Sequence, residues 1–311
     1  MITSNRYPLV DVFAGPGGLG EGFATAFDEY GHPRFQNVVS IEKEEFSFQT
    51  LLLRHFFRQF PNGEAPDAYY DFLGGKITEN ELFDRYKNEH VQAQQSVYKI
   101  SLGSAEQFVT QIIRKRIAVS KCWALVGGPP CQAYSLVGRS RMKHRPDFEQ
   151  DERHTLYREY LRIIATHRPP IFVMENVKGL LSATIEGKLT IKSIVRDLRR
   201  PSIYLNASTN LEYNLYSLSE EVNDGDVLDD PRLFVVRAEE YGVPQARHRM
   251  FILGVRSDLK VPRPKILFRG KSPTVRDMIG AREAARLQTF PDNYYFDDSR
   301  SAVFKQINNT S

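Results

Sequence analysis

The chain has 311 residues, of which 41% are hydrophobic and 26% charged, proportions typical of a soluble globular protein with one large or two medium domains. No run approaches the roughly 18 apolar residues that a membrane-spanning helix needs, and the N-terminus lacks the layout of a secretory signal, so we expect a cytoplasmic protein. A net charge of +4 permits a polyanionic partner without requiring one, and two cysteines, Cys122 and Cys131, predict neither a disulfide framework nor a zinc site.

Short apolar runs rich in β-branched residues alternate with segments that have helical apolar spacing. Helices are predicted over 155–167 and 188–200. This alternation predicts an α/β protein with a doubly wound, mainly parallel sheet, in which ligands bind at the carboxyl ends of the strands. The aromatic-rich segment 54–100 breaks the alternation and is interpreted as a helical insertion. The predicted strands are 8–15, 37–42, 123–128, 171–176 and 249–255.

A glycine-rich stretch, Gly15-Pro16-Gly17-Gly18-Leu19-Gly20, follows the first predicted strand and opens a predicted helix. Glu42 ends the next strand, 22 residues after Gly20. This is the G-x-G-x-x-G pattern followed by an acidic residue that can hold two ribose hydroxyls. The motif predicts adenosine binding. It does not separate a nicotinamide dinucleotide from S-adenosylmethionine, because both carry an adenosine.

Cys131 and Glu175 both follow predicted strands, at the edge of the sheet where ligands gather. The prolines in Gly-Gly-Pro-Pro (127–130) stiffen the chain directly before Cys131. A thiol becomes reactive when it ionises, so Cys131 is a candidate nucleophile, whereas Cys122, beside Trp123, is expected to be a small core residue. Glu175 follows four apolar residues and is a candidate proton donor, with a carboxylate satisfied by backbone amides as the alternative.

Arg247 and Arg249 are two residues apart on a predicted strand, so their side chains project from one face. Together they could clamp an anion and a carbonyl group. Arg-x-Arg is a common surface pattern, and its meaning depends on the motifs around it.

Five stretches resemble, in the same order, the conserved blocks of the DNA cytosine-5 methyltransferase family, and they span roughly residues 9–292. The resemblance implies a Rossmann-like S-adenosylmethionine-dependent methyltransferase fold. It also implies methyl transfer to carbon 5 of cytosine in duplex DNA. The stretches are DVFAGPGGLGEGF, GGPPCQAYS, ENVKGL, YGVPQARHR and REAARLQTFPD.

The same resemblance assigns roles in catalysis. Cys131 would attack carbon 6 of a cytosine flipped out of the duplex, and Glu175 would hold and protonate ring nitrogen 3. Arg249 would bind the ring carbonyl, and Arg247 would help to position the base or a phosphate. Protonation matters because attack on carbon 6 otherwise builds negative charge on the ring. The implied DNA contacts are Gln132, Ser135, Asn176 and Gln245.

The implied cofactor is S-adenosylmethionine, with Glu42 on its ribose. Many family members have an aromatic or apolar residue after this acid, but here Lys43 follows it, which leaves the adenine-stacking partner unassigned. The family's last block usually has a glycine where this chain has Asn308. The other implied cofactor contacts are Phe13, Gly15, Gly17, Gly18, Leu19, Pro129 and Asn309.

The implied domain layout is a catalytic domain over 1–260, a junction at 261–281 and a segment at 282–311 that returns to the catalytic domain. The family places a target-recognition domain at the junction. Only 32 residues separate Arg249 from Arg282, fewer than the about 50 that a domain needs, so we expect that domain to be missing or vestigial. The expected protein is a monomer that acts on duplex DNA at the bacterial nucleoid, with a cognate restriction endonuclease as functional partner.

Three alternatives stay open from the sequence. A transfer RNA methyltransferase of the same family would use the same thiol and glutamate. A nicotinamide-dependent oxidoreductase would share the glycine loop and Glu42, but it would not explain Pro-Pro-Cys, Glu-Asn-Val and Gln-x-Arg-x-Arg together. The intact Cys131 and Glu175 disfavour a catalytically dead DNA-binding or regulatory subunit.

Overall fold

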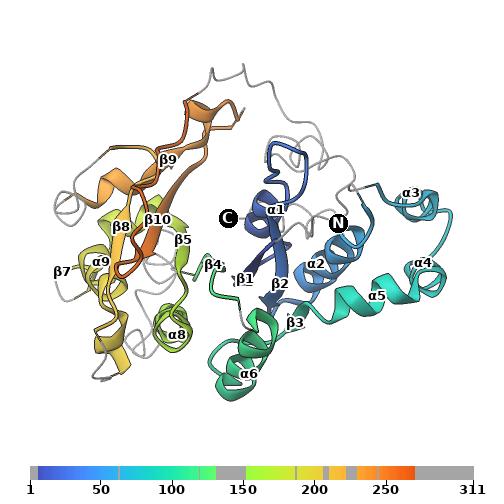
Figure 1. Cartoon of the computed structure of the whole chain (residues 1–311), viewed down its shortest axis with the longest axis horizontal. Helices are drawn as coiled ribbons and strands as arrows, with labels where there is room; N and C mark the ends of the chain where they lie inside the picture. The colour runs from blue at the N-terminus through green and yellow to red at the C-terminus, as the bar shows by residue number, and fades with distance from the viewer. Residues whose placement is uncertain are drawn as a thin grey trace, which may run out of the picture.

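The main sheet has the strand order β3-β2-β1-β4-β5-β10-β8, and β9 pairs with β10 (Figure 1). The computed structural model describes residues 6–61, 64–118, 120–130, 152–185, 188–205, 210–221, 230–243 and 245–269. The strands of this sheet are β1 (Tyr7–Val12), β2 (Phe35–Glu42), β3 (Val97–Lys99), β4 (Ala124–Gly127), β5 (Ile171–Val177), β8 (Tyr213–Tyr216), β9 (Val235–Arg237) and β10 (His248–Arg256).

The strands β3, β2, β1, β4 and β5 are parallel, and β10 runs antiparallel to its neighbours β5, β8 and β9. The doubly wound, mainly parallel, Rossmann-like sheet predicted from the sequence is therefore confirmed. All five predicted strands are present, and the two predicted helices correspond to α8 (Glu152–His167) and α9 (Thr190–Arg199).

Side chains of each strand alternate between the two faces of the sheet. Both sets are largely apolar, so helices cover both faces. On one face, Val10 and Val12 of β1 share a core with α8, α9 and α6 (Glu106–Ile117). On the other face, Leu9 packs with residues of α1 (Gly18–Ala24). The helix α2 (Glu45–Phe57) follows β2 and carries a second apolar core.

The strand order reverses between β1 and β4, and loops at such a reversal leave room for a ligand at the carboxyl ends of the strands. The glycine loop follows β1, and Pro129-Pro130 follow β4. Glu42 and Glu175 lie at the carboxyl ends of β2 and β5. Because β10 is antiparallel, its first residues reach the same edge.

The segment 54–100 is mostly helical, as predicted, and its helices α3 (Asp67–Leu73), α4 (Glu79–Arg85) and α5 (Lys87–Gln94) lie together at the right of Figure 1, beside α2. Tyr69, Leu82 and Phe83 form their core with α2. The segment ends in β3, an edge strand that the sequence did not predict. The segment is therefore joined to the sheet itself.

The prediction that Cys122 is a core residue is wrong, because its side chain is exposed, whereas the neighbouring Trp123 is buried. Cys122 lies just before β4, outside the alternation that buries strand residues.

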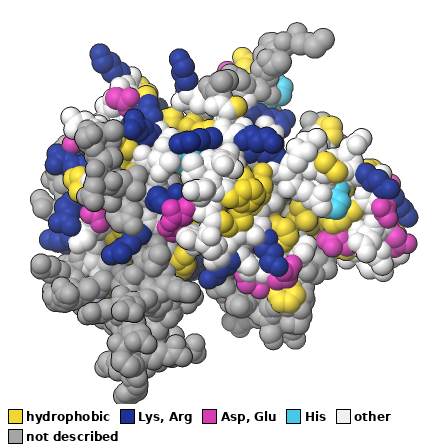
Figure 2. Space-filling model, turned by 90° about the horizontal axis from the view of Figure 1, so that it is seen from below, with side chains coloured by type: hydrophobic (Ala, Val, Ile, Leu, Met, Phe, Trp, Pro, Cys, Tyr) yellow, Lys and Arg dark blue, Asp and Glu magenta, His cyan; other side chains and the backbone are white. Residues whose placement is uncertain are grey.

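Figure 2 views the molecule from below and shows Lys and Arg side chains spread over that face. The remaining elements are β6 (Thr184–Ile185), β7 (Lys188–Leu189), η4 (Lys178–Ser182), η5 (Pro201–Leu205), η6 (Pro231–Phe234) and η7 (Ala238–Tyr241).

Candidate functional site

The glycine loop after β1 has a left-handed backbone at three positions: Phe13 (φ 59°), Gly15 (φ 56°) and Gly17 (φ 98°). Glycine adopts this conformation at little cost, whereas Phe13 is strained in it, and such strain is common at binding sites. The loop continues directly into α1 with Gly18 and Leu19. A loop built in this way exposes its backbone to a ligand.

Glu42 anchors this loop through its carboxylate. Oε2 accepts a hydrogen bond from Gly15 N–H at 2.8 Å. Oε1 accepts from Lys43 N–H at 2.9 Å and from Glu44 N–H at 2.8 Å. Each carboxylate oxygen can accept two hydrogen bonds, so Oε2 retains capacity for a ribose hydroxyl. The glycine loop and Glu42 therefore fit an adenosine-bearing cofactor.

Asp11, in β1 beneath this loop, is a buried carboxyl group that the sequence analysis missed. It is 1% exposed. The pKa of Asp11 is raised to about 8, mainly by burial and in smaller part by Glu42, while the backbone amide of Gly20 partly offsets both. A Cβ on Gly20 would lie only 2.7 Å from Asp11 Oδ2. Asp11 is therefore mainly neutral at pH 7 and packs tightly against α1. An acid inside the apolar run 8–13 was the available signal, since burying a charge there is costly.

Asn176 ties the end of β5 to the loop after β4. It is 4% exposed. Its Nδ2 donates to Pro129 O at 3.1 Å, and its Oδ1 accepts from Val177 N–H at 2.8 Å. Asn176 therefore holds the backbone two residues before Cys131. These bonds lie within the protein, and its role as a DNA contact stays a prediction.

Glu175 and Arg249 form an ion pair at this edge, with Arg249 Nε 3.1 Å from Glu175 Oε1. The side chains are 7% and 23% exposed, respectively. The pair forms because Phe251 lies opposite Glu175 in the antiparallel register, so that Arg249, two residues from Phe251, shares its face of the sheet.

Arg247, directly before β10, adds a second positive charge near Glu175. The pKa of Arg247 is lowered to about 10, mainly by burial and in smaller part by Arg249, while Glu175 partly offsets both. The guanidinium group stays charged at pH 7. Two cations therefore meet one carboxylate, which leaves an excess positive charge for an anion or a polarised carbonyl.

The structure thus gathers most of the predicted site residues at one edge of the sheet. Gln245 lies in the loop that leads into β10. The predicted nucleophile, Cys131, falls outside the described residues, and so do three predicted contacts, Gln132, Ser135 and Asn309.

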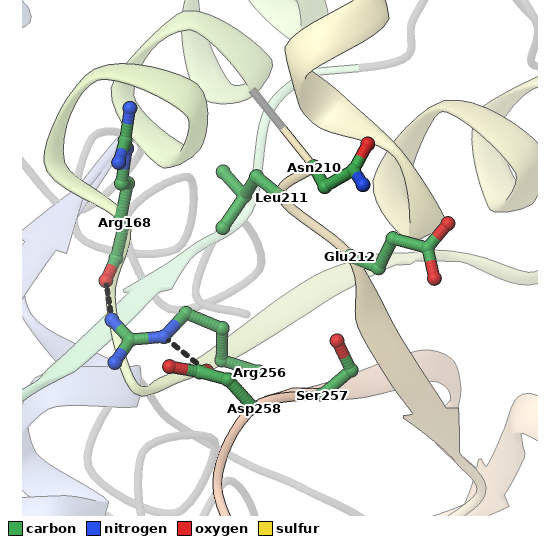
Figure 3. Close-up of a pocket in the computed structure, with 7 residues that line it drawn as sticks. All are labelled: Arg168, Asn210, Leu211, Glu212, Arg256, Ser257 and Asp258. Carbon is green, nitrogen blue, oxygen red and sulfur yellow. Dashed lines mark hydrogen bonds and ion pairs between the residues drawn. The ribbon is translucent and has the colours of Figure 1, made fainter.

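A cavity of about 330 Å³ lies at the opposite edge of the sheet, before β5 and β8 and after β10 (Figure 3). Arg256 Nη1 donates to Arg168 O at 2.6 Å, and Arg256 Nε lies 2.7 Å from Asp258 Oδ1. The charges and hydrogen-bonding groups of these residues are paired with one another, and we assign no chemistry to them.

Within the described ranges, no helix is long and apolar enough to cross a membrane, and no three His, Cys, Asp or Glu side chains are placed to hold a metal ion.

Comparison with known families tests one of the alternatives left by the sequence, the oxidoreductase. The model for the C-5 cytosine-specific DNA methylase family matches residues 78–281. The chain belongs to this family. Membership confirms the resemblance seen in the five motifs, and it disfavours a nicotinamide-dependent oxidoreductase.

Type II methyltransferases from several organisms are similar to the chain. It is 33% identical over 250 residues to the type II methyltransferase M.AquIA of Picosynechococcus sp., covering 80% of this chain and 71% of that one. It is 28% identical over 276 residues to the type II methyltransferase M.Bpa9945I of Bacillus paralicheniformis, covering 82% and 55%, respectively. The chain thus spans about half the length of the latter relative.

Among solved structures, the Dnmt2 methyltransferase of S. pombe superposes with a TM-score of 0.49 at 11% identity, covering 98% of this chain and 94% of that one. The fold assignment rests on the strand order and pairing of the chain itself.

Proposed function

We propose that the protein transfers the methyl group of S-adenosylmethionine to carbon 5 of cytosine in duplex DNA, through a transient bond between Cys131 and carbon 6. The observation that carries this proposal is the placement of Glu175, Arg249 and Arg247 near Pro129, two residues before Cys131, at the same edge as the Glu42-anchored glycine loop. The groups proposed to bind the base and those proposed to bind the cofactor therefore lie together at the carboxyl ends of the parallel strands.

The first step is attack by the Cys131 thiolate on carbon 6, which forms a carbon–sulfur bond and shifts electron density to carbon 5 and nitrogen 3. Glu175 is paired with Arg249 as a carboxylate beforehand, so it takes up a proton as the base enters and then gives that proton to nitrogen 3, which keeps negative charge off the ring. When bound, S-adenosylmethionine supplies the electrophilic methyl group. Loss of the carbon 5 proton to a base then expels the thiolate from carbon 6, and nitrogen 3 returns its proton to Glu175, which restores the neutral aromatic ring.

The two arginines would orient the flipped base. Arg249 pairs with Glu175 before the base enters. We propose that the base then contacts Arg249 through its ring carbonyl and Glu175 through nitrogen 3 and the exocyclic amine, with Arg247 on the base or a neighbouring phosphate. The target cytosine would thus be held at both polar edges, with Gln132, Ser135, Asn176 and Gln245 as further DNA contacts.

The cofactor would lie against the glycine loop. The backbone at Gly15, Gly17 and Gly18 can approach it closely, and Glu42 Oε2 can accept from a ribose hydroxyl. Phe13, Leu19, Pro129 and Asn309 complete the proposed set of contacts.

We place this activity in bacterial restriction–modification. The relatives M.AquIA and M.Bpa9945I are both named type II methyltransferases. A cognate restriction endonuclease would then be the functional partner, and the protein would act as a monomer at the nucleoid. The proposed domain layout is a catalytic domain over 1–260, a junction at 261–281 and a returning segment at 282–311.

Methyl transfer to two nucleic acids tests the proposal. The protein is incubated with labelled S-adenosylmethionine and either unmethylated duplex DNA or transfer RNA, and 5-methylcytosine is measured by mass spectrometry. We expect product in DNA from the parental protein and none from Cys131→Ser, because a hydroxyl is far less ionised than a thiol. Product in transfer RNA alone, or in neither substrate, would refute the proposed function.

A further inference from the structure

Glu239 and His248 form a close pair beside the two arginines. Glu239 lies in η7 and His248 is the first residue of β10, and Glu239 Oε1 is 2.6 Å from His248 Nε2. Both side chains are 29% exposed. β9 pairs with residues 248–250 of β10. The contact between Glu239 and His248 therefore joins the two ends of the segment that connects β9 to β10.

The backbone of this connection is held at the same point. Ala238 N–H donates to Arg247 O at 2.9 Å, and Arg247 N–H donates to Gln245 O at 2.8 Å. Both backbone groups of Arg247 are therefore bonded, one of them to the residue next to Glu239. The side-chain pair and these backbone bonds act on one short segment.

His248 also touches Arg249 through its main chain. Arg249 Nη1 donates to His248 O at 2.9 Å, while Arg249 Nε lies 3.1 Å from Glu175 Oε1. Side chains alternate along a strand, so the His248 ring lies on the face opposite that of the Arg249 side chain. His248 can thus affect a bound base only through the arginines.

We infer that Glu239 and His248 are positioning residues that hold Arg247 and Arg249 in register with Glu175. The inference rests on the proposed function, in which these three groups bind the base. Without the pair, the start of β10 can shift, and a displacement of about 1 Å at a reacting group can slow a reaction by about a hundredfold. Glu42 and the glycine loop, which are proposed to bind the cofactor, belong to β2 and β1, beyond β5 and β4 in the sheet, so we expect them to be unaffected.

Single-turnover methyl transfer at saturating cofactor, with DNA varied, tests the inference. Glu239→Ala should lower the maximal rate by about tenfold or more and leave the dissociation constant of S-adenosylmethionine unchanged. Glu239→Gln retains an oxygen that accepts from His248 Nε2–H, so it should restore most of the rate. The matched control is Glu240→Ala, which removes the neighbouring carboxylate that Arg237 Nη1 contacts at 2.9 Å, and it should transfer at the parental rate.

Three results would overturn the inference: a parental rate in Glu239→Ala, no rescue in Glu239→Gln, or equal losses of rate and cofactor affinity. A further check is the double variant Glu239→Ala/His248→Ala, which should be no slower than the slower single variant, because both changes break one contact. Absence of methyl transfer by the parental protein would instead overturn the proposed function, and this inference with it.

Discussion

Glu175 and Arg249 meet across neighbouring antiparallel strands, with 3.1 Å between Oε1 and Nε. Arg249→Ala removes this cation from a carboxyl group that is only 7% exposed, so the free energy of unfolding should fall by about 1–3 kcal/mol. Urea unfolding measures this loss, and methyl transfer should fall with it.

The control is Arg256→Ala, at the other end of the same strand. Arg256 pairs with Asp258, far from Glu175 along β10, so this variant should retain the rate of methyl transfer even if its stability falls. Equal rate losses in both variants would argue against a specific role for Arg249.

Glu42→Ala should weaken binding of S-adenosylmethionine by about 1–3 kcal/mol, because the ribose contact and the anchor of Gly15 are lost together. Titration calorimetry measures the affinity. Glu45→Ala is the matched control, since Glu45 pairs with Lys99 on the exposed start of α2 and should bind as the parental protein does. Unchanged affinity in Glu42→Ala would contradict the cofactor assignment.

Two glycines of α1 should respond differently to alanine. At Gly20, a Cβ would lie 2.6 Å from Asn37 Nδ2 and 2.7 Å from Asp11 Oδ2, whereas at Gly22 nothing lies within 4 Å. Gly20→Ala should destabilise the protein by about 1–3 kcal/mol through overpacking. Gly22→Ala should be neutral or stabilise it by up to about 1 kcal/mol, because alanine favours helix. Thermal unfolding of both variants checks this, and equal effects would refute the close packing.

Asp11 should make stability fall as pH rises. Its pKa is about 8 in the folded protein and near 3.8 in the unfolded chain, so between these values the unfolded chain releases a proton that the folded protein keeps. The free energy of unfolding therefore loses at most about 1.4 kcal/mol per pH unit from this group. Asp11→Asn should gain stability relative to the parental protein between pH 5 and pH 8. A stability difference that is the same at both pH values would show that Asp11 does not titrate in this way.

The sequence predicted the sheet well because strands buried on both faces are nearly continuous apolar runs, such as 171–174 before Glu175. It missed β3 because three residues, Val97–Lys99, are too few to show a period. Their strand conformation depends on pairing with β2, which is a tertiary contact. The burial of Cys122 was wrongly predicted because the exact start of β4 could not be read from the sequence: the strand begins at Ala124, and Cys122 lies in the loop before it.

The site was predictable as a set of residues rather than as a geometry. Glu175 and Arg249 are distant in the sequence, and only the register of β5 against β10 brings them together. Asn176 was predicted to contact DNA, but no pattern indicated its bond to Pro129. The pairing of Glu239 with His248 depends on how η7 folds back on β10, which local sequence does not encode.

Covalent trapping tests the central claim, attack by Cys131, most directly. The substrate is duplex DNA in which every cytosine carries fluorine at carbon 5, because fluorine replaces the proton whose loss releases the enzyme. Incubation with S-adenosylmethionine, digestion and mass spectrometry should reveal DNA bound to a peptide containing Cys131. Cys131→Ser should form no adduct, and Cys122→Ser should behave as the parental protein does. An adduct at Cys122, or methyl transfer to ordinary DNA by Cys131→Ser, would contradict the mechanism.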